Sequence, residues 1–418
     1  MENVKNTCIK AVTIVDPNSP FHLKKMDVWI EKGRIKKIAK SIVPSTTTTI
    51  VEGKEMFLSA GWIDGQVRVG EPGNEDAETF ATASHAATKG GITDVVVFPS
   101  HNPPTYQAAQ VAYIKQNGQN GIKFHPVGCL SEQMKGKQLS EMFDMKNAGA
   151  IAFSDDKSAV STTLLARALE YSKTFNGLVI VLPFNHELNP GGLMHEGKTS
   201  TQMGTKGLSN VSEYMQIQRD IEILKYTGGR LHFSNISCSE SVDIIRKAKK
   251  SGLAVTCGIA AHQLSFIDED LKLFPSNLKT LPPFRTSKDR DALIKGLADN
   301  TIDIIMSDHT PVVIEEKNVE FEYASFGISS IQHAFQIAFT ALEGDLSLEE
   351  IIQKWTINPS QIFGIPTHRI EEGETLRATL FTTAENTLVN KKDWKSKSAN
   401  SPFIGEWLSG RVIDTYCS

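Results

Sequence analysis

The hydrophobic pattern of the chain differs between its first fifty residues and the part that follows. At the start, apolar and polar positions alternate with a period of two, which is typical of strands that bury one face. Three runs, Cys8–Val15, Met26–Ile38 and Thr47–Val51, predict short antiparallel strands, and residues 31–34 interrupt the second run like a hairpin turn. We therefore expect a small β unit at the start of the chain.

From about residue 60 onward, short and nearly continuous apolar runs replace the alternation, and an amphipathic stretch follows each run. Strands that are buried on both faces have such runs, so repeated β-then-α units predict a parallel (β/α)8 TIM barrel. The eight predicted strands are Gly61–Val69, Asp94–Ser100, Gly121–Cys129, Ala150–Asp155, Leu178–Phe184, Arg230–Ser237, Ala254–Ala261 and Asp303–Asp308.

Amphipathic segments between these runs predict the helices of the barrel. A last helical stretch, Ser347–Trp355, follows the eighth strand. The segments between the strands are Asp76–Lys89, Gln107–Gln116, Ser140–Ala148, Thr162–Thr174, Val211–Thr227, Ser239–Ser251 and Asp289–Ala298.

The pattern typical of strands returns near the end of the chain, at Thr379–Phe381 and Glu406–Thr415. A short isolated β segment cannot bury its own face, so we expect these strands to join those at the start of the chain. The predicted architecture is a TIM barrel over residues 56–365 and a small composite β-sandwich domain from residues 1–55 and 366–418.

Composition excludes several classes of protein. Lys+Arg total 44 and Asp+Glu total 48, so the net charge of −4 gives no electrostatic reason to expect a nucleic-acid or anionic-membrane partner. The longest apolar run, Leu178–Phe184, falls far short of the roughly 18 residues that span a bilayer. The first residues do not have the pattern of a signal peptide. Five scattered cysteines without a C-x-x-C pair favour reduced thiols in a cytoplasmic protein.

Catalytic residues of TIM-barrel enzymes lie at the carboxyl ends of the strands. The motifs at these ends, and in the loops and tail, are Glu71-Pro72-Gly73, Asn102-Pro103-Pro104, Phe153-Ser154-Asp155-Asp156, residues 194–197 and 204–207, Pro282-Pro283-Phe284-Arg285, Asp308-His309-Thr310-Pro311 and residues 398–403. In content and order they resemble those of the dihydroorotase family of the amidohydrolase superfamily. The resemblance covers nearly the whole chain and implies a role in pyrimidine biosynthesis.

The resemblance implies one or two zinc ions at the barrel mouth, where metal-bound hydroxide attacks a cyclic amide. The first family ligands are a His-x-His pair on strand 1, and here these positions hold Gln66 and Arg68. Gln is a poor zinc ligand, and a guanidinium has no lone pair to offer. The family histidines of strands 5 and 6 fall at Pro183 and Asn235. Most metal-ligand positions are therefore degenerate.

Carboxylates remain at the other ligand positions, namely Asp155 or Asp156 on strand 4 and Asp308 on strand 8. A zinc site needs three or four ligands in fixed geometry, and these do not supply them. Either Asp155 or Asp156 faces the mouth, and either one equally fits the role of a cap for the following loop. The sequence predicts no metal.

The substrate positions that the resemblance implies are altered as well. The family arginine that holds the substrate carboxylate corresponds to Gly70, and two family asparagines correspond to Ser100 and Leu281. Loss of a bidentate arginine removes both charge and orientation. Metal ligands and substrate contacts have therefore changed together.

Asp308 corresponds to the family's proton-shuttling carboxylate, and without metal-bound water we interpret it as vestigial. Strand 8 neighbours strand 1 when a barrel closes, so we predict that Arg68 lies beside Asp308 as a counter-charge. Arg285 and Lys206 are interpreted as loop anchors.

The remaining histidines give a second set of expectations. His232, His262 and His309 are interpreted as structural histidines with satisfied hydrogen bonds. His101 and His186 lie near the expected mouth, and a rearranged metal site with Asp308 is the alternative for these two.

The leading hypothesis is a metal-free pseudoenzyme that acts as a scaffold or regulatory partner. The resemblance suggests aspartate carbamoyltransferase as a partner, and self-association is the other possibility. The alternative is an active, zinc-dependent dihydroorotase or another cyclic amidohydrolase with a rebuilt site. A third possibility is a small-molecule sensor that uses the barrel mouth as its pocket.

Overall fold

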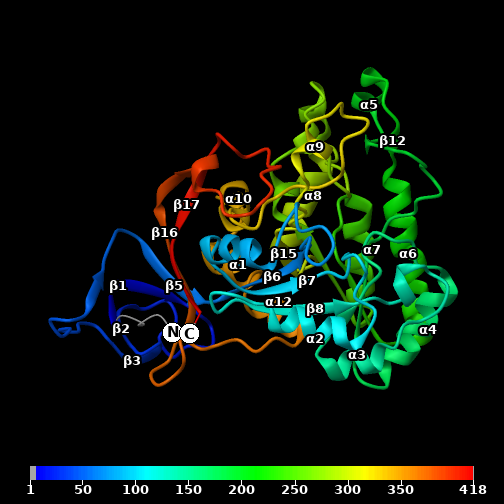
Figure 1. Cartoon of the computed structure of the whole chain (residues 1–418). Helices are drawn as coiled ribbons and strands as arrows, with labels where there is room; N and C mark the ends of the chain where they lie inside the picture. Colours follow the sequence, from blue (N-terminus) through cyan, green and yellow to red (C-terminus); the bar gives the residue numbers. More distant parts are fainter. Residues whose placement is uncertain (1–5, 418) are drawn as a thin grey trace.

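The computed structural model describes residues 6–417, which form a barrel flanked by a β-sheet built from both ends of the chain (Figure 1). Eight parallel strands run in the order β6-β7-β8-β9-β10-β13-β14-β15, and a bridge between Val67 and His309 brings the last strand to the first. The predicted TIM barrel is confirmed. Its strands are β6 (Trp62–Val67), β7 (Ile92–Val97), β8 (Lys123–Gly128), β9 (Ala152–Phe153), β10 (Leu178–Val181), β13 (Arg230–Phe233), β14 (Val255–Ala260) and β15 (Ile304–Met306).

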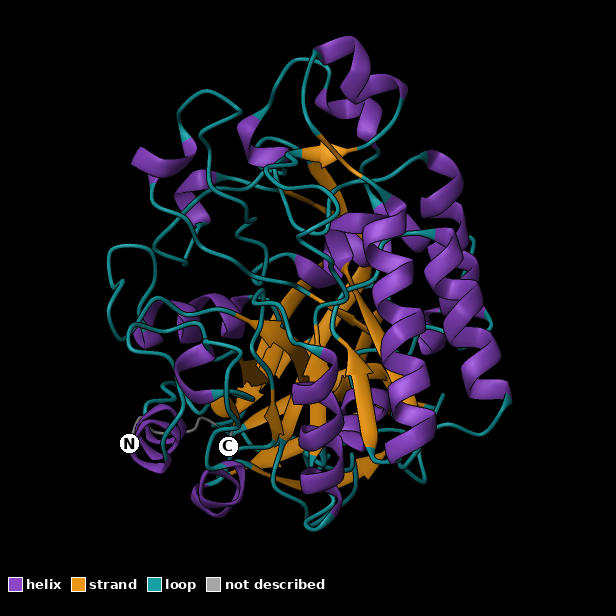
Figure 2. Cartoon of the chain, turned by 90° about the vertical axis from the view of Figure 1, so that its right-hand side faces the viewer, coloured by secondary structure: helices purple, strands orange, loops and turns teal. Residues whose placement is uncertain are grey.

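Helices pack around the strands, and the loops that follow the strands gather on one side, at the top of Figure 2. We call this side the barrel mouth. A short pair, β11 (Met194–His195) and β12 (Gly207–Leu208), lies in one of its loops. The α-helices are α1 (Phe80–Lys89), α2 (Ala108–Gln116), α3 (Met142–Ala148), α4 (Thr162–Lys173), α5 (Lys198–Met203), α6 (Asn210–Thr227), α7 (Ser239–Lys250), α8 (Ser287–Ala298), α9 (Ile314–Lys317), α10 (Ala334–Leu342), α11 (Leu348–Gln353) and α12 (Ile357–Phe363).

Short 3-10 helices complete the loops and the tail: η1 (Glu132–Met134), η2 (Ala261–Leu264), η3 (Asp268–Leu271), η4 (Ser276–Leu278) and η5 (Lys391–Asp393). Within residues 6–417, no helix combines the length and apolar character that a bilayer crossing requires.

Most barrel strands end earlier than the apolar runs predict. The run at β10 continues to Phe184, but the strand ends at Val181. Pro183 has no backbone N–H to donate to a ladder, so the strand cannot extend through it. The polar residues that end the predicted runs therefore lie in the loops of the barrel mouth.

The terminal strands form one sheet in the order β17-β16-β5-β1-β2-β3, with β4 paired to β1. As predicted, the C-terminal strands join the N-terminal ones, since β16 pairs with β5. The antiparallel prediction is wrong for β4, which pairs with β1 in parallel. The pattern did not predict β5, which also pairs with β1 in parallel. The strands are β1 (Thr7–Val15), β2 (Lys25–Glu31), β3 (Arg34–Ala39), β4 (Thr49–Val51), β5 (Met56–Ala60), β16 (Arg377–Leu388) and β17 (Trp407–Cys417).

An irregularity in β1 explains the two parallel neighbours. Ala11 has φ of 48° and lies where the β1–β2 register shifts. Residues 7–9 pair with β4, and residues 13–15 pair with β5. An inserted residue bends and twists a strand, so one strand can serve two neighbours in succession.

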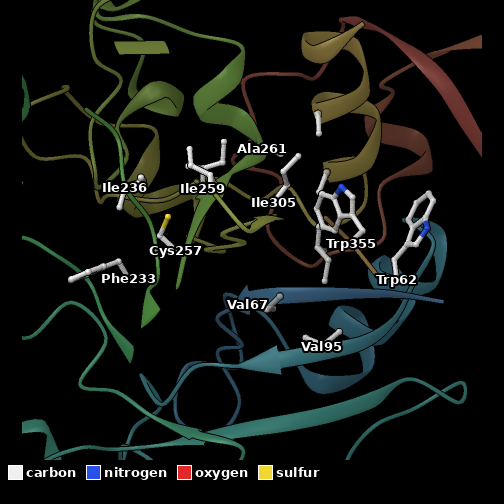
Figure 3. Close-up of a cluster of buried hydrophobic side chains, with 14 of the residues drawn as sticks. Trp62, Val67, Val95, Phe233, Ile236, Cys257, Ile259, Ala261, Ile305 and Trp355 are labelled. Carbon is white, nitrogen blue, oxygen red and sulfur yellow. The ribbon is translucent and has the colours of Figure 1, made fainter. Parts of the chain in front are cut away.

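The barrel and the terminal sheet share a hydrophobic core (Figure 3). Helix α10 lies in this core, where the ring of Phe335 is 4.3 Å from Trp62 of β6 and 5.2 Å from Phe381 of β16. Most residues of α10 are apolar and buried. A short, nearly continuous apolar run does not distinguish a buried helix from a buried strand, so the hydrophobic pattern did not predict this helix.

Candidate functional site at the barrel mouth

Arg68 lies at the centre of the polar network at the mouth. It directly follows β6, and its side chain is buried with 8% exposure. Nε and Nη2 donate to the two carboxylate oxygens of Asp156 at 2.8 and 2.5 Å. Nη1 donates to Asp308 Oδ1 at 2.6 Å and to Thr310 Oγ1 at 2.8 Å. The predicted pair between Arg68 and Asp308 is confirmed, and the structure adds Asp156 to it.

The two carboxylates that hold Arg68 share an unusual backbone conformation. Asp156 has φ of 49° and Asp308 has φ of 50°, in the left-handed region that few residues other than glycine adopt. Burial alone would raise the pKa of Asp156, but the adjacent Arg68 outweighs burial and lowers it. The ion pair therefore keeps Asp156 charged and fixes the orientation of both carboxylates.

Asp155 lies in a different environment from its neighbour. Its Oδ1 accepts hydrogen bonds from the backbone N–H groups of Leu130 and Ser131 at 2.9 and 2.8 Å. Asp155 thus anchors the loop after β8, and Asp156 is the carboxylate of the mouth. The positive φ of Asp156 interrupts the alternation of side chains along the strand. The sequence therefore could not show which of the two aspartates faces the mouth.

The other positions of the expected metal ligands differ in their hydrogen bonding. Asn235 donates from Nδ2 to Asp308 Oδ2 at 3.1 Å and accepts from the Ala260 N–H at 3.1 Å. Gln66 is buried, and neither atom of its side-chain amide has a hydrogen-bond partner among the described residues. Pro183 has no ligating atom in its side chain.

These residues do not fit a zinc ion. The cation between Asp156 and Asp308 is a guanidinium, which cannot ligate a metal and repels a second positive charge. Across the described part of the chain, no group of three or more His, Cys, Asp or Glu side chains is placed to hold a metal ion. The rearranged site from His101, His186 and Asp308 is therefore not formed.

The altered substrate positions have structural roles of their own. A Cβ atom at Gly70 would lie 2.0 Å from the carbonyl oxygen of Asn74, so the local backbone leaves no space for a side chain. The Ser100 hydroxyl donates to Asp156 and belongs to the Arg68 network. Leu281 is half-buried and offers no polar group. None of the three can hold a carboxylate as an arginine does.

Two of the predicted structural histidines have satisfied hydrogen bonds. His232 Nδ1 lies 2.8 Å from the hydroxyl of Thr256. His309 Nδ1 accepts from the Ser330 N–H at 3.1 Å, so Nε2 carries the proton and donates to Glu78 at 3.1 Å. His101 is buried beside Thr105, and His186 is exposed against the carbonyl of Lys157.

The prediction for His262 is wrong. This fully buried side chain lies edge-on to Phe284, and neither of its ring nitrogens has a hydrogen-bond partner among the described residues. His262 lies in η2, which directly follows β14, and its ring packs against the Phe284 ring. Burial lowers the pKa of His262 to about 4, and the charge of Asp308 offsets only part of that effect.

The neutral state of His262 makes stability depend on pH. Between its folded pKa of about 4 and an unfolded pKa of about 6.5, the unfolded chain binds a proton that the folded chain excludes, so stability falls as the pH falls. When the pH is lowered from about 7 to about 5, we predict that the wild type loses about 2 kcal/mol more unfolding free energy than His262→Leu does. Urea unfolding at several pH values measures this, with the exposed His85→Leu as the matched control. An unchanged pH profile in His262→Leu would contradict the assignment.

The loop-anchor interpretation holds for Arg285, which donates from Nε to Ser237 at 3.0 Å and lies 3.5 Å from Glu213. Lys206 is exposed and contributes its backbone carbonyl, which accepts from the Leu193 N–H at 2.9 Å.

Sequence reasoning missed two parts of this region. Lys157 follows Asp156, and burial together with the charge of Arg68 lowers its pKa to about 8. Glu78 is fully buried and accepts from His309, Ser396 and the Lys397 N–H. Glu78 lies far along the chain from these donors, and no local motif marks it.

Comparisons with known proteins show the family of this chain. Residues 55–241 match the Dihydro-orotase-like family model. The dihydroorotase of Acetivibrio thermocellus is 38% identical over 415 residues, covering 97% of this chain and 96% of that protein. The dihydroorotase of Syntrophus aciditrophicus is 35% identical over 413 residues, with coverage of 97% and 96%. The chain belongs to the dihydroorotase family.

Solved structures share the fold of this dihydroorotase family member. The L-hydantoinase of Arthrobacter aurescens superposes with a TM-score of 0.83 at 21% identity, covering 99% of this chain and 96% of that one. A dihydropyrimidinase from Brevibacillus agri gives 0.80 at 19% identity, with coverage of 98% and 93%. At these identities the likeness concerns the fold.

Proposed function

We propose that this dihydroorotase homologue of pyrimidine biosynthesis has lost hydrolytic activity and acts as a cytoplasmic scaffold or regulatory partner. The observation that carries the proposal is the ion pairing of Arg68 with both Asp156 and Asp308. A fixed organic cation balances the two carboxylates but cannot generate hydroxide from water as a Lewis acid does. The family's pairing with aspartate carbamoyltransferases makes that enzyme the candidate partner.

Loss of the substrate contacts supports the same proposal. Gly70 has no space for a side chain, Ser100 donates to Asp156, and Leu281 is apolar. An enzyme that kept its reaction with a different metal arrangement would still need to hold its anionic substrate. The metal-ligand and substrate positions have changed together, which favours loss of activity over a rebuilt metal site.

The alternative is an active dihydroorotase or related cyclic amidohydrolase, which would require zinc. Whole-chain identity of 35–38% to proteins named dihydroorotase favours this alternative. Asp308 would then be a working carboxylate, and Arg68 would have to leave its two partners during turnover.

We predict that the purified protein carries less than stoichiometric zinc and does not hydrolyse dihydroorotate above background. Elemental analysis and a hydrolysis assay with added zinc measure the two quantities. The dihydroorotase of Acetivibrio thermocellus serves as the reference in both assays. Stoichiometric zinc together with turnover would reject the pseudoenzyme and favour the alternative.

A further inference from the structure

We propose that two loops at the barrel mouth form a docking surface for a second protein whose contact surface is apolar and positively charged. The inference rests on the proposed scaffold function, because it names the surface through which that scaffold acts. The surface consists of residues 269–274 and 314–323, and we call it the mouth patch. Its second loop follows β15 and carries α9, at the top of Figure 1.

The mouth patch exposes large apolar side chains to solvent. Leu273 is 91% exposed, Tyr323 is 74% exposed and Ile314 is 64% exposed. Phe274 and Val319 are exposed on the same two loops. Single exposed apolar residues are common, but several on adjoining loops mark an interaction site.

The two loops are held together as one unit. The rings of Phe274 and Phe321 lie 6.1 Å apart, and Leu271 and Phe321 belong to one buried cluster. The ammonium group of buried Lys279 donates to the carbonyl oxygens of Phe321 and Glu322 at 2.8 and 2.9 Å. Buried lysine is uncommon, and here it ties the first loop to the second.

A second buried lysine fixes the base of the later loop. Lys317 donates to the carbonyl oxygens of Lys279 and Ser325 at 3.1 and 2.8 Å. Loops that are already ordered lose little conformational freedom when a partner binds, which favours association. The exposed apolar side chains therefore project from a preorganised support.

A hollow of about 800 Å³ borders the mouth patch. Ile314, Glu315 and Glu316 line it on the side of the patch, and Lys391 and Lys397 line it on the side of the C-terminal tail. A projecting side chain of a partner would enter this hollow, and such buried anchors dominate the energy of protein interfaces.

The charge of the mouth patch selects the chemistry of its partner. The exposed cation in these two stretches is Lys272, since Lys317 is buried. A two-fold contact with a second copy would oppose like charges, whereas a basic surface complements them. The exposed carboxylates are Glu269, Asp270, Glu315, Glu316, Glu320 and Glu322.

The test measures association of the full chain with aspartate carbamoyltransferase of the same organism by sedimentation velocity. Two variants address the mouth patch: Leu273→Ser/Tyr323→Ser removes apolar contacts, and Glu320→Lys/Glu322→Lys reverses charge. The matched control is Tyr226→Ser, because Tyr226 is 84% exposed near the end of α6. Thermal unfolding shows that each variant is folded.

We expect Kd to rise at least about tenfold in both patch variants and to stay unchanged in the control. Added salt is expected to weaken the wild-type complex. Wild-type affinity in the patch variants, or no wild-type complex, would overturn the inference. Self-association that the patch variants abolish would also overturn it, in favour of a second copy. Zinc content and turnover decide separately whether the chain is an enzyme, so the two proposals can fail independently.

Discussion

Replacement of Arg68 by alanine is expected to lower the free energy of unfolding by about 3–5 kcal/mol. The variant leaves Asp156 and Asp308 buried without their shared cation, with exposures of 4% and 3%. The remaining hydrogen-bond donors, Ser100 and Asn235, are neutral, and Lys157 alone cannot balance two carboxylates. Urea unfolding near neutral pH measures the loss.

An exposed arginine–carboxylate pair serves as the control and shows how much of the lost stability comes from the burial of the Arg68 pairs. Arg411 pairs with Glu385 at 2.7 Å on the surface, and Arg411→Ala is expected to cost less than about 1 kcal/mol. In wild type, Asp156 has a lowered pKa, so its stabilising contribution is present above the unfolded pKa and is lost as the pH falls through the folded pKa. The deficit of Arg68→Ala should therefore shrink in acid, where the carboxylates are neutralised. A loss equal to that of Arg411→Ala would show that Arg68 is not the counter-charge.

Replacement of Glu78 by alanine is expected to destabilise the protein by a comparable amount, about 3–5 kcal/mol. The Lys397 N–H donates to Glu78 Oε1 at 3.0 Å, and His309 Nε2 donates to Oε2 at 3.1 Å. Burial would raise the pKa of Glu78, but the hydrogen bonds from His309 and Ser396 outweigh burial and lower it. Alanine leaves these buried donors without an acceptor.

Glu78→Ala should also loosen the C-terminal tail, because Glu78 connects this tail to the barrel mouth. Limited proteolysis of Glu78→Ala is expected to cleave near residues 391–400 faster than in wild type. Glu75→Ala is a suitable control, since Glu75 is exposed and accepts from the Gly73 N–H at 2.9 Å. Equal cleavage rates in Glu78→Ala and wild type would contradict the connecting role.

The sequence predicted the parts of the molecule that follow from local pattern. The eight barrel strands were found because buried parallel strands are continuously apolar. The contact of Arg68 with Asp308 followed from the closure of the barrel, which makes the first and last strands neighbours. These inferences needed only periodicity and topology.

The sequence left open the features that depend on packing between distant segments. The choice between Asp155 and Asp156 depends on a left-handed backbone at Asp156, which neighbouring residues do not encode. His262 was expected to have partners, yet it is packed against Phe284. Helix α10 was missed because its nearly continuous apolar run is also typical of a buried strand, and only its packing between Trp62 and Phe381 shows its place in the fold.

The backbone around Gly70 has an evolutionary consequence. A mutation that restored arginine at this position would bring its Cβ against the carbonyl of Asn74 before the guanidinium could reach any ligand. Reversion therefore requires prior remodelling of the residues that follow, in addition to new histidines at positions 66 and 68. Under the proposed loss of hydrolysis, no single substitution would restore the metal ligands and the substrate contact together.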